Sequence, residues 1–224
     1  MLISDLHEFA STVLLAVGAL LAIVNPLGGA PIYLAMTSHL TPAERARLTK
    51  HVALYGFALL LASVLVGAYV LDFFGVSVPA VQVAGGFIVC AVAWSLLNSP
   101  SEPAVSERSQ DGVASDWSRG AFYPLTMPLT VGPGSMSVAI TLGANPPSGL
   151  RPLLTTALAH VLGVLITALA IYLCYRYAER ILSRLGKTGI SILIRLSAFM
   201  LFCIGVQIVW NGLHTLLATL IRPL

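Results

Sequence analysis

Two short segments rich in proline and glycine could bind a small polar solute. The first is NPLGGAP (25–31) and the second is PLTMPLTVGPGS (124–135). Proline removes a backbone hydrogen bond from a helix and glycine weakens it, so both segments predict interrupted helices. A helix that restarts after Gly29 or Gly134 would present free N–H groups and the positive end of its dipole, which suit a carboxylate. Carbonyl groups freed by the prolines would accept hydrogen bonds from an ammonium group, and the Asn25 amide can donate or accept.

These groups together suit a small zwitterion. The candidate substrate-binding residues are Asn25, Pro26, Gly28, Gly29, Thr130, Gly132, Pro133, Gly134 and Ser135. The alternative interpretation is that the prolines and glycines only kink the helices and allow tight packing, because both residues are common in transmembrane helices. An interruption in each half of the chain favours the binding interpretation.

Titratable side chains are scarce in the apolar parts of the sequence. No Asp or Glu lies inside an apolar stretch, since Glu8 and Asp72 fall at the edges. A cationic substrate would therefore lack a counter-ion, and we expect neither a metal nor a cofactor. His160 lies in the middle of an apolar stretch. It could carry a coupling proton, or it could be a neutral histidine that is hydrogen-bonded to a neighbouring helix.

The elements that position these residues are predicted to be transmembrane helices. Apolar residues make up 57% of the 224 residues, charged residues 9%, and the mean hydropathy is +0.90. About 25% charge is usual in a soluble domain, so the solvent of this chain must be mostly lipid. Six stretches are long enough to cross a bilayer: about 9–38 with a break after Val24, 49–71, 78–97, 121–142, 152–175 and 191–217.

Basic residues are concentrated on alternate links between these stretches. The links 39–48, 98–119 and 176–190, with their flanks, carry nine of the twelve Lys and Arg residues, and the opposite side carries only Arg151 and Arg222. The positive-inside rule then places both termini on the periplasmic or extracellular side. The sequence has no basic patch interleaved with aromatics, so nucleic acid is not an expected partner.

The two halves of the chain resemble each other. An offset of 113 residues pairs Cys90 with Cys203 and Asn98 with Asn211, and the two interruptions both fall in the first stretch of a half. Three stretches per half make the second half enter the membrane from the opposite face, as in many secondary transporters. We therefore predict an all-α membrane protein, a single integral domain over 1–224, with inverted repeats at about 9–97 and 120–220 and a polar cytoplasmic link at 98–119.

Several other residues are interpreted as packing groups. Gly85 and Gly86 are expected to permit close contact with the first or fourth stretch, and Tyr175 is expected to be an interfacial or packing aromatic. The five histidines are scattered and no carboxylate pair faces the membrane interior, so we do not expect an enzyme.

Four segments make the chain resemble the MarC family of membrane proteins. They are NPLGGAPIY (25–33), VPAVQVAGGFIV (78–89), AFYPLTMPLTVGPGS (121–135) and the Asn-Gly at 211–212. The resemblance implies a six-span bacterial inner-membrane protein with periplasmic termini. It also implies a transporter of neutral amino acids, because some relatives are described that way.

The predicted function is secondary transport of small neutral amino acids, glycine-like or alanine-like zwitterions. The alternatives are export of another small metabolite and a non-transporting scaffold or channel. The sequence leaves the coupling ion, the direction of transport and homo-oligomer formation open.

Overall fold

All the regular elements are helices in the part of the chain that the computed structural model describes, which covers residues 2–98, 121–144, 147 and 149–221. The predicted polar link at 98–119 lies outside that part apart from its first residue. The elements in chain order are α1 (Leu2–Val24), α2 (Pro26–Met36), α3 (Pro42–Phe73), α4 (Val78–Asn98), the π-helical η2 (Ala121–Thr130), α6 (Pro133–Gly143), α7 (Leu150–Arg176) and α8 (Ala178–Ile221).

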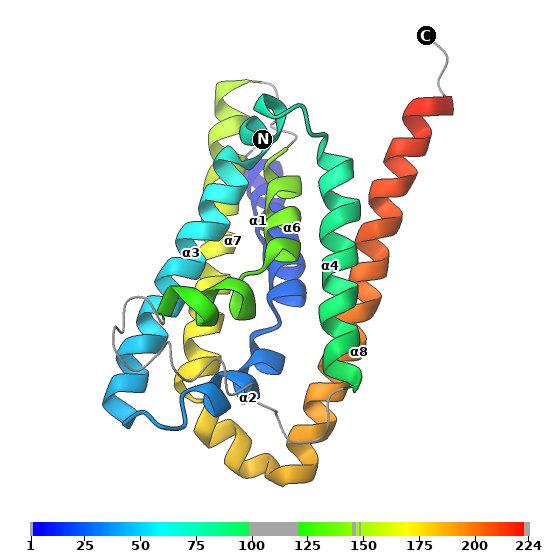
Figure 1. Cartoon of the computed structure of the whole chain (residues 1–224). Helices are drawn as coiled ribbons and strands as arrows, with labels where there is room; N and C mark the ends of the chain where they lie inside the picture. Colours follow the sequence, from blue (N-terminus) through cyan, green and yellow to red (C-terminus); the bar gives the residue numbers. More distant parts are fainter. Residues whose placement is uncertain (1, 99–120, 145–146, 148, 222–224) are drawn as a thin grey trace.

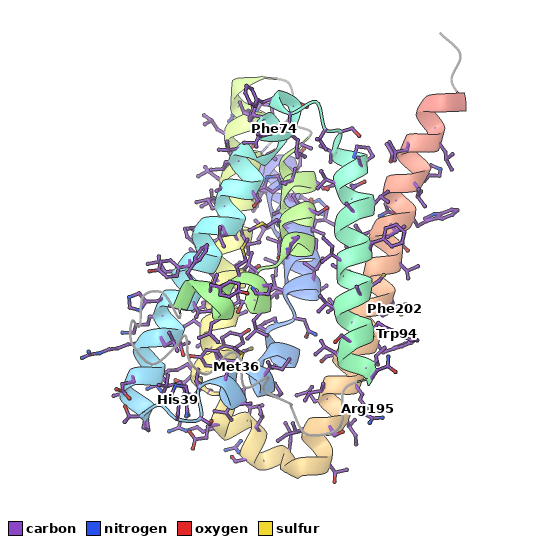
Figure 2. All side chains as sticks on the ribbon, in the orientation of Figure 1. Met36, His39, Phe74, Trp94, Arg195 and Phe202 are labelled. Atoms are coloured by element: carbon purple, nitrogen blue, oxygen red, sulfur yellow. The ribbon has the colours of Figure 1, made fainter. Side chains whose placement is uncertain are left out.

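Five of these segments are long and apolar enough to cross a membrane, and a sixth crossing results if η2 and α6 form one broken span with a bend of 70°. Figure 1 shows that α1 begins and α8 ends at the same end of the molecule. An even number of crossings is required for that arrangement, so the bent pair fits the sixth span. The side chains of Met36, His39 and Arg195 lie at the opposite end from Phe74 (Figure 2).

Both predicted helix interruptions are present. Asn25 separates α1 from α2 and has a left-handed backbone with φ 45°. Asparagine tolerates this conformation better than most residues because its short amide can hydrogen-bond locally. The predicted restart positions are wrong by a few residues: α2 begins at Pro26 rather than after Gly29, and α6 begins at Pro133 rather than after Gly134. Proline is favoured at the first position of a helix, where its missing N–H has no helical acceptor.

The region 176–190, predicted as a link, is instead largely helical. Helix α8 starts at Ala178 and continues across a kink at Gly186, whose φ is 65°. Ala178 and Leu182 are buried one turn apart, while Arg180 and Arg184 are exposed. This spacing gives the segment an apolar face and a basic face, which is sufficient to make it helical.

Helices α4 and α8 form the most extensive contact in the molecule, and they stand side by side in Figure 1. Trp94 and Phe202 lie at this contact with ring centroids 6.2 Å apart (Figure 2). Gly86 allows the close approach, because a Cβ there would lie 2.8 Å from the Gly205 carbonyl oxygen. The predicted contact with the first or fourth stretch is therefore wrong for Gly86, which meets the sixth, and it is confirmed for Gly85, which faces Ser137 of α6 in the fourth. Small residues let transmembrane helices approach in this way.

Candidate functional site

A cavity of about 290 Å³ lies beside the first helix interruption. It is bounded by the end of α1, by α2, and by parts of α4, η2 and α8. The lining residues are Val24, Asn25, Gly28, Gly29, Ile32, Met36, Val92, Leu96, Pro128, Leu129, Ile194, Ser197 and Ala198. Most of these side chains are apolar, so the few polar groups at the wall determine where a charged or polar solute would bind.

Asn25 supplies the main polar side chain at this wall. Its Oδ1 accepts a hydrogen bond of 3.2 Å from the Gly28 N–H and so caps α2, and its main-chain oxygen accepts the Gly29 N–H at 3.0 Å. Within the described residues, the Asn25 Nδ2 group has no hydrogen-bond partner. An amide of this kind keeps two donors for a solute while its oxygen holds the helix end in place.

Gly28 and Gly29, which have no side chain, allow α2 to approach its neighbouring helices closely. A Cβ on Gly28 would lie 2.8 Å from the Ser197 Cβ of α8, and a Cβ on Gly29 would lie 2.8 Å from the hydroxyl oxygen of Tyr175. Real Cβ atoms almost never make contacts this short. Glycine at both positions is therefore needed for α2 to reach α7 and α8 while still bordering the cavity. Pro26 is buried at the start of the same helix.

The second interruption contributes to the cavity through its upstream part. Pro128 and Leu129 of η2 line the cavity, opposite the first interruption. Thr130, next to them, is buried, and its hydroxyl donates to the Leu125 carbonyl at 2.7 Å. That carbonyl is five residues back, and Thr126 bonds the Ala121 carbonyl with the same spacing. Threonine hydroxyls thus satisfy backbone carbonyls in a segment whose backbone leaves the helical conformation at Tyr123 and Met127.

Tyr175 connects the two interruptions. Its hydroxyl lies 3.0 Å from the Thr130 Oγ1 of the second interruption and abuts Gly29 of the first. Its ring stacks on Tyr33 of α2, with centroids 4.4 Å apart and planes 12° apart. The Tyr33 hydroxyl in turn lies 2.8 Å from the Thr49 Oγ1 of α3. Four elements are joined by this buried stack, which forms a polar layer directly behind the glycine wall of the cavity.

The four remaining predicted residues lie on the far side of the second interruption. Gly132, Pro133, Gly134 and Ser135 begin α6, and none of them is among the residues that line the cavity. Gly134 packs against Val89 of α4, and the Ser135 hydroxyl donates to the Gly132 carbonyl at 2.9 Å. The structure therefore brings Asn25, Gly28 and Gly29 together with η2, while the start of α6 contacts α4.

His160 occupies a different place from the Asn25 cavity. It is 9% exposed and borders a separate hollow of about 90 Å³ formed by α3, α7 and the end of α6. Tyr69 and Thr156 line the same hollow. Within the described residues, the imidazole has no hydrogen-bond partner. The hollow lies near the ends of α3 and α6 from which the short links leave, away from the basic residues of α3 and α8.

Sequence reasoning misses two residues at the site. The sequence marks Tyr175 only as an interfacial or packing aromatic, and it does not single out Ser197 of α8 as a cavity residue. Nothing in the local sequence identifies the role of either one, because their partners lie 45 and 169 residues away at Thr130 and Gly28. A weak signal exists for Ser197, since it is the first of the small residues that match Ala84-Gly85 in the repeat alignment.

Comparisons with known proteins agree with this architecture. Residues 10–217 match the family of MarC integral membrane proteins. A UPF0056 membrane protein of Methanocaldococcus jannaschii is 32% identical over 210 residues, which cover 94% of this chain and 98% of the relative. The UPF0056 inner membrane protein MarC of Salmonella typhimurium is 30% identical over 205 residues, which cover 89% of this chain and 93% of the relative.

The corresponding MarC protein of Escherichia coli O1:K1 / APEC is 31% identical over 212 residues, with coverage of 89% and 93%. No solved structure matches the chain. The match extends over both interruptions and over all but the outermost few residues of the candidate membrane spans in the described residues. The chain therefore belongs to the MarC family of integral membrane proteins.

Proposed function

We propose that the protein is a secondary transporter of small neutral amino acids, with the substrate held in the cavity beside Asn25. The observation that carries this proposal is that parts of both helix interruptions border one cavity: Asn25, Gly28 and Gly29 of the first, and Pro128 and Leu129 of the second. Interrupted transmembrane helices that meet at a cavity are the usual binding architecture of secondary transporters.

The size and chemistry of the cavity support a small zwitterion. About 290 Å³ is just below the usual range for ligand pockets, roughly 300–1,000 Å³, and so suits only a small solute. The free Nδ2 donors of Asn25 and the start of α2 suit a carboxylate, because the helix dipole is positive there. The apolar side chains of Ile32, Met36 and Leu96 suit a short aliphatic side chain and not a charged one.

An inverted repeat is part of the same proposal. The predicted counterpart stretches are in contact in each case: the first with the fourth, through α1 with α6 and α2 with η2, the second with the fifth, through α3 with α7, and the third with the sixth, through α4 with α8. Pairing of equivalent helices is what a two-fold axis in the membrane plane would produce. The links 39–48 and 176–190, with their basic residues, lie at one end of the molecule, where Arg45 is ion-paired with Glu179. The positive-inside rule then assigns that end to the cytoplasm and both termini to the outside. Location in a bacterial inner membrane follows the names of the bacterial relatives.

Uptake into proteoliposomes tests the proposal. Purified protein should accumulate labelled glycine or alanine above protein-free vesicles, and unlabelled substrate inside should accelerate influx of the label. The second effect separates a carrier from a channel, because only a carrier exchanges substrate across a moving site. No flux over a broad amino-acid panel, in either direction, would remove the proposal.

Two asparagine variants test the site itself. Asn25→Asp keeps an oxygen to cap α2 but removes the Nδ2 donors and adds a negative charge at the carboxylate site, so we expect uptake to fall more than tenfold. Asn98→Asp makes the same chemical change at the exposed end of α4 and should leave uptake within a factor of two. Equal losses in both variants would show that the binding site lies elsewhere.

A further inference from the structure

The cavity lies between two groups of helices that contact each other in only a few places. One group is α4 with α8. Besides the contact at Gly86, their backbones approach each other at two more glycines: a Cβ on Gly205 would lie 3.0 Å from the Cys90 nitrogen, and a Cβ on Gly212 would lie 2.7 Å from the Pro79 oxygen. Contacts along this length of two helices leave little room for sliding. Helix α4 and the part of α8 that follows the kink at Gly186 therefore behave as one unit, which we call the α4–α8 pair. The start of α8 is not part of the pair, because Glu179 there is ion-paired with Arg45 of α3.

The second group contains α1, α2, α3, η2, α6 and α7, which we call the six-element body. The stack of Tyr33 on Tyr175, with its bonds to Thr49 and Thr130, joins α2, α3, η2 and α7. Gly163 of α7 faces the Ala16 side chain of α1, where a Cβ would lie 2.7 Å away. By contrast, α8 makes only brief contacts with α1 and α7.

Two seams join the α4–α8 pair to the six-element body, and the first of them is closed. In the α4–α6 seam, the Ser137 hydroxyl donates to the Val81 carbonyl at 3.0 Å and Gln82 Nε2 donates to Thr141 Oγ1 at 3.2 Å. Gly85 faces Ser137 so closely that a Cβ there would lie 2.6 Å from the Ser137 Cβ. Hydrogen bonds and backbone contact thus seal this seam over several turns.

The second seam, between α2 and α8, is closed at one point and open beyond it. Gly28 meets Ser197 at the closed point, where a Cβ on Gly28 would lie 2.8 Å from the Ser197 Cβ. Farther toward the basic end, Ile32 and Met36 of α2 and Ile194 of α8 face the cavity instead of sealing the seam. The offset of 113 residues makes Gly85 the counterpart of Ala198, so the two seams are counterparts in the proposed repeat.

We propose that the α4–α8 pair rocks against the six-element body, so that the α4–α6 and α2–α8 seams open alternately. In this structure the cavity extends along the α2–α8 seam toward the basic end, while the α4–α6 seam is shut. This inference rests on the proposed transport function and adds the route by which the substrate enters and leaves. Two counterpart seams in opposite states are expected of alternating access and not of a static scaffold.

Cysteine labelling in nanodiscs tests the coupling of the two seams. Cys90, Cys174 and Cys203 are first replaced by alanine. A single reporter is then introduced, either Ile194→Cys in the cavity or Thr141→Cys in the closed seam, and its rate of reaction with a membrane-impermeant maleimide is measured. In the unperturbed protein the Ile194 reporter should react at least tenfold faster than the Thr141 reporter.

A wedge in the closed seam provides the perturbation. Gly85→Leu, or the milder Gly85→Ala, places atoms against Ser137, so we expect labelling at Thr141 to rise at least fivefold and labelling at Ile194 to fall at least fivefold. Gly18→Leu is the matched control, because nothing lies within 4 Å of a Cβ there. Retention volume in size-exclusion chromatography identifies any wedge variant that has not folded.

A disulfide lock keeps the inference testable if the wedge variants do not fold. Oxidation of a Gln82→Cys, Thr141→Cys variant joins the closed seam, after which the Ile194 reporter should still react and uptake should stop until the disulfide is reduced. A change at one reporter with none at the other, or full uptake by the locked protein, overturns the inference. Coupled labelling without any amino-acid flux would instead leave the motion standing and remove the proposed function.

Discussion

Replacing Gly29 with alanine is expected to have opposite effects depending on whether Tyr175 keeps its hydroxyl group. A Cβ at Gly29 would lie 2.8 Å from the Tyr175 hydroxyl oxygen but 3.7 Å from the nearest ring carbons. Crowding of this kind costs about 1–3 kcal/mol. Alanine in place of glycine within a helix gains about 1 kcal/mol. In the natural background, Gly29→Ala should therefore destabilise the protein by about 0–2 kcal/mol.

Tyr175→Phe removes the oxygen that causes the crowding. This change costs about 1 kcal/mol, because the 3.0 Å hydrogen bond to Thr130 is lost while Thr130 keeps its bond to Leu125. In that background Gly29→Ala meets only ordinary contacts and should stabilise the protein by about 1 kcal/mol. The double-mutant cycle then gives a coupling of about 1–3 kcal/mol between the two positions.

Thermal unfolding in detergent measures the cycle. For a chain of this length, 1 kcal/mol shifts the midpoint by roughly 2–4 °C. The midpoint should thus fall by up to about 8 °C on Gly29→Ala in the natural background and rise by about 2–4 °C in the Tyr175→Phe background. Gly18→Ala, where nothing lies within 4 Å of the added Cβ, should change the midpoint by the same amount in the natural and the Tyr175→Phe backgrounds. If Gly29→Ala lowers the midpoint equally in both backgrounds, the contact between α2 and α7 is not as described.

Three further outcomes are expected. Arg45→Ala should lower the free energy of chemical unfolding by about 1.5–3 kcal/mol, because the guanidinium donates to the Thr37 carbonyl at 3.0 Å. Glu179→Gln, at the exposed end of the 3.1 Å ion pair with Arg45, should change that free energy by less than about 1 kcal/mol. Similar losses in the two variants would contradict this difference. His160→Gln should abolish stimulation of uptake by a pH gradient but leave counterflow intact, and unchanged stimulation excludes proton transfer by His160. Gly86→Val should destabilise by about 2–3 kcal/mol, since α8 backbone lies 2.8 Å from the added carbon, and a heat-stable variant would refute the close α4–α8 packing.

The helix interruptions are predictable because they depend on local chemistry. Proline at 26 and 133 fixes a backbone that starts a helix, and asparagine at 25 accepts a left-handed conformation. The helix at 178–185 is also within reach of sequence reasoning. Arg176, Arg180 and Arg184 recur every fourth residue, which is a helical spacing, although the density of charge gives the segment the composition of a link.

Other parts of the site depend on contacts between distant segments. A single binding site built from both interruptions requires 25–31 to meet 132–135, which depends on how far the chain turns between η2 and α6. The 70° bend there leaves 132–135 against α4. The Tyr175–Thr130 contact joins residues 45 positions apart on different helices. Periodicity and composition identify helices and their breaks, but they carry no information about which neighbour a given helix face will meet.

The hydroxyl groups of Tyr33 and Tyr175 are already engaged by Thr49 and Thr130. They have little capacity left to distinguish one solute from another, and the cavity wall that would meet a solute's side chain is almost wholly hydrocarbon. An apolar wall separates homologous ligands by only about 1–3 kcal/mol per methylene. A protein with this wall would discriminate by bulk alone, accepting a series of short aliphatic compounds and rejecting those that are too large.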